Sequence, residues 1–162
     1  EKIQAAKQAL ENSSNSSAFI SSAQLLADAD EAWKAYAKAG LITDHETGDT
    51  GNNYSFSQCT WWVYIRRHQL GLTAGSLMGN GNQWANTARS LGYSVSNTPM
   101  VGDVMVFAAG QEGSDGYYGH VAIVEGITTD GSVITSECGA SRNGQPYSRV
   151  ISNTSRFEYI HY

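Results

Sequence analysis

The sequence of 162 residues has little charge, only two cysteines and two prolines, and no long apolar run. Charged residues make up 15% of the chain, against about 25% in an average soluble domain. The net charge is −5 and no block of lysine and arginine occurs, which excludes the basic footprint of a nucleic-acid-binding protein. No stretch approaches the roughly 18 apolar residues of a membrane-spanning helix, so we expect no membrane insertion by this chain.

The shortage of cysteine also narrows the possibilities. Cys59 and Cys138 are too few for a disulfide scaffold, and no CxxC motif or His/Cys cluster with zinc spacing is present. In an oxidising compartment the two could form a single disulfide. A reactive thiol is the other interpretation, and composition alone leaves both open.

The length favours one domain with an appendage over two enzymatic domains. The chain begins at Glu1 and has no signal-peptide pattern, so we expect it to be a piece of a longer, modular polypeptide. Its many polar, uncharged residues are typical of an extracellular bacterial protein.

Two regions differ in pattern. We predict a helical lead-in or linker over residues 1–45 and a catalytic domain over residues 46–162. Apolar residues recur at helical spacing from Leu25 to Ala37, and Gly40 falls where a helix would stop. The run Asn12–Ser17 should break this segment into two helices or fray it. We expect the lead-in to pack on the following domain, with a partner-binding helix pair as the alternative.

The second region begins with helices and continues with strands. Helices are predicted over Gln58–Leu70, with Ser57 as N-cap and Gly71 at the end, and over Gln83–Leu91. From Val95 the apolar period becomes two. The predicted strands are Asp103–Ala108, Gly119–Ile127, Ser132–Cys138, Arg149–Ser152 and Arg156–His161. This order predicts an α+β fold with the N-terminal helices packed on an antiparallel β-sheet.

Two residues could carry chemistry in this arrangement. Cys59 lies at the predicted start of a helix, where free N–H groups and the positive end of the helix dipole favour a thiolate. An inert, buried cysteine is the common alternative. His120 opens an apolar strand directly after the Gly-rich loop Gly110–Gly119, which leaves one side of that strand end open. The alternative for His120 is a strand-end histidine satisfied by the backbone.

Glu137 is the candidate group to orient His120. If the loop is Thr128–Gly131, Ile127 pairs with Ser132, and Glu137 becomes a diagonal neighbour of His120 on one face of the sheet. There a carboxylate would fix the imidazole tautomer and stabilise the imidazolium. A two-residue turn at Asp130–Gly131 instead places Glu137 too far away. In the first register, strict alternation points Cys138 to the opposite face, away from Cys59, so we predict two free thiols.

Six short motifs follow one another along the second region, and their order and spacing are more specific than any single motif. They are Gln58–Val63 (QCTWWV), Gly81–Ala85 (GNQWA), Gly92–Val95 (GYSV), Thr98–Asp103 (TPMVGD), Gly119–Glu125 (GHVAIVE) and Asp130–Glu137 (DGSVITSE). Over about residues 52–162 the chain resembles the CHAP family of cysteine, histidine-dependent amidohydrolases/peptidases. The resemblance implies a papain-like fold, with Cys59 as nucleophile, His120 as base and Glu137 as orienting carboxylate. Many members place an asparagine two residues after that glutamate, where this chain has Gly139, and Asn143 is only a distant substitute.

The resemblance implies a secreted peptidoglycan hydrolase that acts through a cysteine thioester, located outside the cell or in the cell wall. It would be an N-acetylmuramoyl-L-alanine amidase or an endopeptidase of the stem peptide or cross-bridge. Its partners would be the peptidoglycan substrate and other domains of a longer chain. A catalytically silent wall-binding or scaffold module is the alternative, and an intracellular or transfer-type thiol enzyme is a third possibility.

The remaining site residues are expectations about the groove. The backbone N–H of Cys59 and the side chain of Gln58 are candidates for stabilising the oxyanion. Tyr54 and Tyr118 are candidates for lining the substrate groove, together with Tyr117. Some family members bind calcium just before the cysteine, but here residues 50–56 contain no carboxylate, so we expect neither a metal nor a cofactor.

Overall fold

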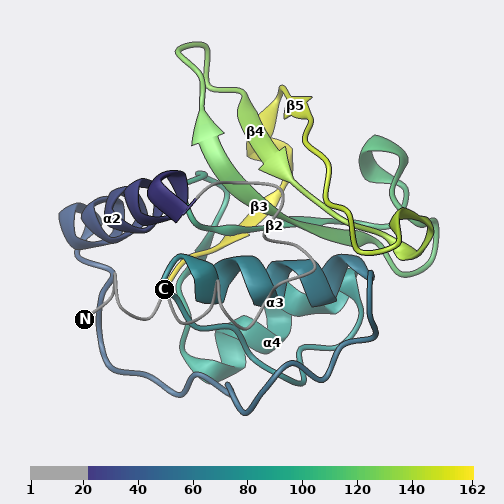
Figure 1. Cartoon of the computed structure of the whole chain (residues 1–162), viewed down its shortest axis with the longest axis horizontal. Coiled ribbons are helices and arrows are strands. Elements are labelled where there is room, and N and C mark those ends of the chain that lie inside the picture. Colours follow the sequence, from purple (N-terminus) through teal and green to yellow (C-terminus); the bar gives the residue numbers. More distant parts are fainter. Residues whose placement is uncertain (1–21) are drawn as a thin grey trace.

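The computed structural model describes residues 22–162, so the predicted break at Asn12–Ser17 lies outside the described residues. Within the described residues, three α-helices precede a run of short strands, as the change of period predicts (Figure 1). The helices are α2 (Ser22–Ala39), α3 (Cys59–Gln69) and α4 (Trp84–Leu91). The strands are β1 (Val95–Ser96), β2 (Val104–Phe107), β3 (His120–Ile127), β4 (Val133–Ser136), β5 (Val150–Ile151) and β6 (Glu158–Ile160). Single 3-10 turns lie at Gly81–Gln83, Gln111–Gly113, Ala140–Arg142 and Thr154–Arg156.

The six strands form one sheet in the order β1-β6-β2-β3-β4-β5. Every neighbouring pair is antiparallel. The predicted α+β fold, with helices packed on an antiparallel sheet, is therefore confirmed. The long strand β3 lies at the centre, between β2 and β4, and its first residue is His120.

Alternation along the strands supplies two apolar layers. One face of β2 and β3 carries Val104, Val106, Val121 and Ile123, which pack with buried residues of α3 and α4. The opposite face carries the second layer, composed of Met105, Phe107, Ala122, Val124, Val133, Ile151, Phe157 and Tyr159. Because both faces are covered, the central strands read as nearly continuous apolar runs. Figure 1 shows α3 and α4 together on one side of the sheet.

Helix α2 is docked on this core. Leu25, Ala29, Ala32 and Tyr36 recur on one helix face and are all buried. The Tyr36 hydroxyl donates to Asp103 Oδ1 at 2.9 Å. The expected packing of the lead-in on the following domain is therefore confirmed for α2, while the division at residue 45 stays a prediction.

A buried arginine strengthens the docking of α2. Arg66 of α3 is fully buried, and its Nη2 lies 2.6 Å from Asp28 of α2 and 2.7 Å from Glu125 of β3. The two carboxylates offset the free-energy cost of burying the guanidinium. Without such partners, a buried charge would be strongly destabilising. A single side chain thus links α2, α3 and the sheet.

The start of α3 differs from the prediction. Gln58, not Ser57, is the N-cap residue, and it makes no side-chain capping bond. Ser57 has a φ of 72°, and its hydroxyl donates to the Gly139 carbonyl at 2.7 Å and accepts the Gly144 N–H at 2.9 Å. These contacts with a distant loop replace the local cap.

The turn between β3 and β4 is longer than predicted. Ile127 pairs with Val133, so the loop is Thr128–Ser132 and the predicted Ile127–Ser132 pair is wrong. The side chains of Thr128 and Asp130 close this turn, since both accept the N–H of Ser132, at 3.1 Å each. Local turn chemistry therefore adds one residue to the loop.

A β-bulge then restores the predicted alignment. The register shifts between Val124 and Gly126, and beyond it Ile123 pairs with Ser136. That pair belongs to the alignment in which Glu137 is a diagonal neighbour of His120, so the predicted register is confirmed beside the site. The bulged residue between them, Glu125, reaches Arg66 and accepts the Ser136 hydroxyl at 2.6 Å.

Among residues 22–162, no helix is long and apolar enough to cross a bilayer.

Candidate active site

Cys59 is the first residue of α3. At this position the backbone N–H groups of the first turn have no partner within the helix, and the helix dipole presents its positive end. Both features favour negative charge on the sulfur. The fold therefore places Cys59 where the sequence predicts it, half-buried at the start of the central helix.

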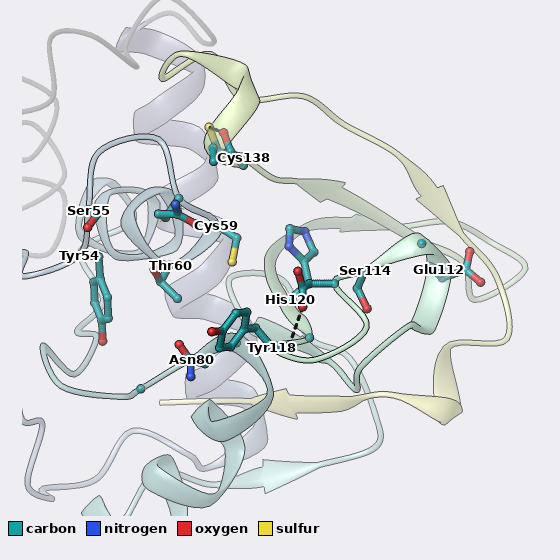
Figure 2. A pocket seen from close by; sticks show the side chains of 18 of the residues that line it. Tyr54, Ser55, Cys59, Thr60, Asn80, Glu112, Ser114, Tyr118, His120 and Cys138 are labelled. Carbon is teal, nitrogen blue, oxygen red and sulfur yellow. Dashed lines mark hydrogen bonds between the residues drawn. The ribbon is translucent and has the colours of Figure 1, made fainter.

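His120 and Glu137 meet at the end of the central strands. His120 Nε2 lies 2.8 Å from Glu137 Oε1, and the Glu137 side chain is fully buried. Since Nε2 is engaged by the carboxylate, Nδ1 is the nitrogen left for Cys59. Figure 2 shows the Cys59 side chain and the His120 ring facing each other across the cavity.

The pKa values of this pair move in opposite directions. Burial alone would lower the pKa of His120, but its hydrogen bonds with Cys59 and Glu137 outweigh burial and raise it to about 9. Burial alone would raise the pKa of Glu137, but hydrogen bonds from His120, Arg149 and Thr135 lower it to about 2. At neutral pH the imidazole is therefore charged beside an ionised carboxylate, and a charged imidazole favours a thiolate on the neighbouring Cys59.

A cavity of about 670 Å³ opens in front of Cys59 and His120. Its walls come from the start of α3, the turn before α4, the loop before β3 and the segment after β4. They include Asn53–Ser55, Gln58–Thr60, Gly79–Gly81, Glu112–Asp115, Tyr118–His120, Cys138–Ala140, Tyr147 and Arg149. Most of these lining residues carry polar side chains or expose backbone N–H and C=O groups.

The model of the CHAP domain matches residues 49–139, which span Cys59, His120 and Glu137. The chain belongs to the CHAP domain family. The predicted resemblance is thus confirmed, and two of its motifs bring Cys59 and His120 to the cavity.

Three similar proteins come from Staphylococcus aureus. The chain is 39% identical over 111 residues to a probable autolysin LDP, covering 68% of this chain and 38% of that protein. It is 42% identical over 113 residues to the staphylococcal secretory antigen SsaA, covering 68% and 41% of the two chains. A solved N-acetylmuramoyl-L-alanine amidase aligns with a TM-score of 0.65 and 36% identity, covering 74% of this chain and 33% of that one. The chain thus spans about two fifths or less of the length of these relatives.

The CHAP motif at Gly81–Ala85 has a direct steric reason. A Cβ atom on Gly81 would lie 2.7 to 2.9 Å from the backbone N, Cα and C atoms of His120. Real Cβ atoms do not approach other atoms so closely, so only glycine lets this turn pack against the start of β3. The turn thereby holds the backbone of His120 in place.

Of the remaining predicted site residues, Tyr54, Gln58 and Tyr118 line the cavity, whereas Tyr117 does not. The Tyr54 hydroxyl is used within the fold, donating to the Gly75 carbonyl at 2.7 Å and accepting the Met78 N–H at 3.0 Å. Tyr118 is 49% exposed at the rim. Gln58 is exposed beside Cys59. The oxyanion and substrate roles of these residues stay predictions.

Both cysteines are free thiols. The prediction of two free thiols is confirmed, and alternation places Cys138 on the face of the sheet opposite Glu137, while its direction relative to Cys59 stays a prediction. That face of the sheet is the one that α3 covers, and Cys138 Sγ lies 3.7 Å from the hydroxyl of Ser57, two residues before Cys59. Cys138 also lines the cavity wall.

Asp49, the acidic residue nearest before the cysteine, is engaged elsewhere. Asp49 accepts the Tyr64 hydroxyl, and its Oδ2 lies 2.6 Å from His68 Nε2. Within residues 22–162, no group of three or more His, Cys, Asp or Glu side chains could hold a metal ion.

Sequence reasoning missed the groups that hold Glu137 from its other side. Arg149, just before β5, donates from Nε and Nη2 to the two oxygens of Glu137, at 2.8 Å each. Thr135 donates to Oε2, and the Tyr147 hydroxyl lies 3.4 Å from Oε1. The available signal was the predicted strand beginning at Arg149, because pairing it with β4 brings Arg149 beside Thr135 and Glu137.

Proposed function

We propose that this CHAP domain hydrolyses an amide bond of bacterial peptidoglycan, with Cys59 as nucleophile. The observation that carries the proposal is that Cys59 and His120 line one cavity, with the buried Glu137 joined to His120 at 2.8 Å behind it. The autolysin and amidase names of the similar proteins support the substrate. The secretory-antigen name of another supports a location outside the cell.

In the first half of the reaction, Cys59 acts as a thiolate whose proton already resides on His120, the state that the charged imidazole favours. The thiolate then attacks the carbonyl carbon of the scissile amide, and the electron pair of the C=O bond moves onto oxygen. The backbone N–H of Cys59 and the side chain of Gln58 are the donors we assign to this oxyanion. When the intermediate collapses, the C–N bond breaks, His120 protonates the leaving amine, and a thioester to Cys59 remains.

In the second half, neutral His120 accepts a proton from water as that water attacks the thioester carbonyl. The C–S bond breaks, the acid leaves, and the sulfur recovers its proton or remains a thiolate beside imidazolium. Glu137 stays ionised throughout and holds the imidazole ring. Two bonds fit this chemistry equally: the N-acetylmuramoyl-L-alanine amide and a peptide bond of the stem or cross-bridge.

The test is digestion of purified peptidoglycan, with mass spectrometry of the released fragments. We expect wild-type protein to release fragments, and Cys59→Ala and His120→Ala to lose about 10³-fold or more of the rate. His68→Ala is the matched control because His68 lies on α3 outside the cavity lining, and it should remain active. New N-terminal L-alanine would identify an amidase, and new N-termini elsewhere an endopeptidase.

Digestion that survives Cys59→Ala would overturn the cysteine mechanism. A folded wild-type protein that binds peptidoglycan without cutting it would replace this proposal with the silent wall-binding module.

A further inference from the structure

Arg149 makes more contacts with the site than its place at the edge of the sheet suggests. Its Nε and Nη2 donate to opposite oxygens of Glu137, at 2.8 Å each, in a bidentate pair. Its Nη1 donates to the Glu112 carbonyl at 2.8 Å, and its guanidinium lies 5.6 Å from the centre of the Phe107 ring. All three nitrogens are thus engaged, so the plane of the guanidinium is fixed.

The fixed guanidinium determines where the carboxylate of Glu137 can point. Glu137 Oε1 is shared between His120 and Arg149, while Oε2 takes the other Arg149 bond and the Thr135 hydroxyl. Rotating the carboxylate would break these bonds together. The oxygen that His120 contacts is therefore held in position by a residue that does not touch His120.

We propose that Arg149 is a positioning residue of the active site, which holds the Glu137 carboxylate, and through it the His120 ring, ready for proton exchange with Cys59. The inference rests on the proposed roles of Cys59 and His120. Gly139, which stands where many family members have an asparagine, has no side chain and cannot hold the Glu137 carboxylate.

Arg149 also balances charge at the site. Glu137 has no exposed side-chain surface, while the Arg149 side chain is 32% exposed at the cavity wall. Without the guanidinium, the buried carboxylate would face only His120, Thr135 and Tyr147, with Glu112 nearby adding negative charge. Loss of this positive charge disfavours a thiolate on Cys59, because the net charge around the sulfur becomes more negative.

The test measures Cys59 directly and needs no peptidoglycan. The full chain is alkylated with iodoacetamide across a range of pH, and peptide mass spectrometry follows the Cys59 peptide separately from that of buried Cys138. The rate reports the thiolate fraction. Arg149→Gln removes the charge, and Arg149→Lys keeps the charge but cannot donate in parallel to both oxygens. Arg142→Gln is the matched control, since Arg142 is exposed and bonds the Gln145 carbonyl, not Glu137.

We expect the midpoint of the alkylation profile to rise by about half a unit to one unit in Arg149→Gln and by less in Arg149→Lys. Arg142→Gln should match the wild type. A merely structural role would lower the melting temperature without moving the midpoint. If Arg149→Gln does not fold, Arg149→Lys decides alone, and an unchanged midpoint in the folded lysine variant overturns the proposal.

These outcomes are separate from those of the proposed function. A shifted alkylation profile in a protein that digests no peptidoglycan would retain the role of Arg149 and reject the substrate. Digestion of peptidoglycan by a protein whose alkylation profile is unchanged by the Arg149 substitutions would retain the substrate and reject the role of Arg149.

Discussion

Replacing Glu137 with glutamine should change how the stability of the protein depends on pH. The pKa of Glu137 falls from an ordinary 4.5 to about 2 in the folded protein, despite burial, because His120, Arg149 and Thr135 donate to the carboxylate. A carboxyl with a depressed pKa stabilises the fold above its unfolded pKa and loses this contribution as the pH falls through the folded value. The contribution is worth about 3 kcal/mol and should vanish between about pH 4.5 and pH 2.

His120 has the opposite sign. Burial lowers its pKa, but Cys59 and Glu137 raise it from 6.5 to about 9. Its contribution is fully present below pH 6.5 and is lost as the pH rises through about 9. The two contributions share the contact between His120 and Glu137, so they are not added. The pair should stabilise the fold most between about pH 4.5 and pH 6.5.

The assay is urea unfolding followed by tryptophan fluorescence at pH 2.5, 5.5 and 9, for wild type and Glu137→Gln. The difference in unfolding free energy between the two proteins should shrink by about 3 kcal/mol from pH 5.5 towards pH 2, since the other carboxyls titrate in both. Above pH 6.5 the variant should lose less unfolding free energy than the wild type, because only Cys59, and no longer Glu137, raises the pKa of its His120. Glu158→Gln, which changes an exposed carboxyl paired with Arg89, is the matched control. A constant difference across the acid range would refute this account of the pair.

Two further predictions concern the framework of the site. Arg66→Met should lower the unfolding free energy by about 3 kcal/mol, because it leaves the carboxylates of Asp28 and Glu125 without their cation. The control Lys34→Met, on the exposed face of α2, should leave the unfolding free energy unchanged within error, and similar urea midpoints for the two variants would contradict the predicted stabilisation by the buried pairs. Gly81→Ala should reduce peptidoglycan digestion about 100-fold, because its Cβ displaces the backbone of His120. The control Gly116→Ala, whose Cβ would meet no atom within 4 Å, should be active, and a wild-type rate of digestion by Gly81→Ala would contradict this steric role.

Local signals were sufficient to predict the α-helices of the second region, five of the six strands and the position of Cys59, but not the two-residue strand β1. Gly71 and Gly92 have φ values of 74° and 97° at the ends of α3 and α4, as the predicted stops require. The strands follow from the apolar period of two. Because Cys59 and His120 lie at the first positions of α3 and β3, their placement follows from the boundaries of those elements.

Long-range contacts explain where local rules failed. Ser57 has the composition of an N-cap, but it bonds Gly139 and Gly144, which are more than 80 positions away in the sequence. Alternation places Cys138 on the face opposite Glu137, yet alternation does not say which face the helix carrying Cys59 will cover. The partners of Glu137 also escaped prediction, because Arg149 reaches it only through the pairing of a two-residue edge strand.

Because of the bulge at Glu125, the alignment of His120 with Glu137 does not depend on the length of the hairpin tip. In a regular hairpin, one extra residue in the turn would reverse the facing of every side chain down to His120 and Glu137. Here the bulge absorbs that residue, and Arg66 and Ser136 anchor it at a fixed point of the strand. The tip at Thr128–Ser132 is therefore a natural place for a tag or a fused peptide, since changes beyond the anchor need not be transmitted to the cavity.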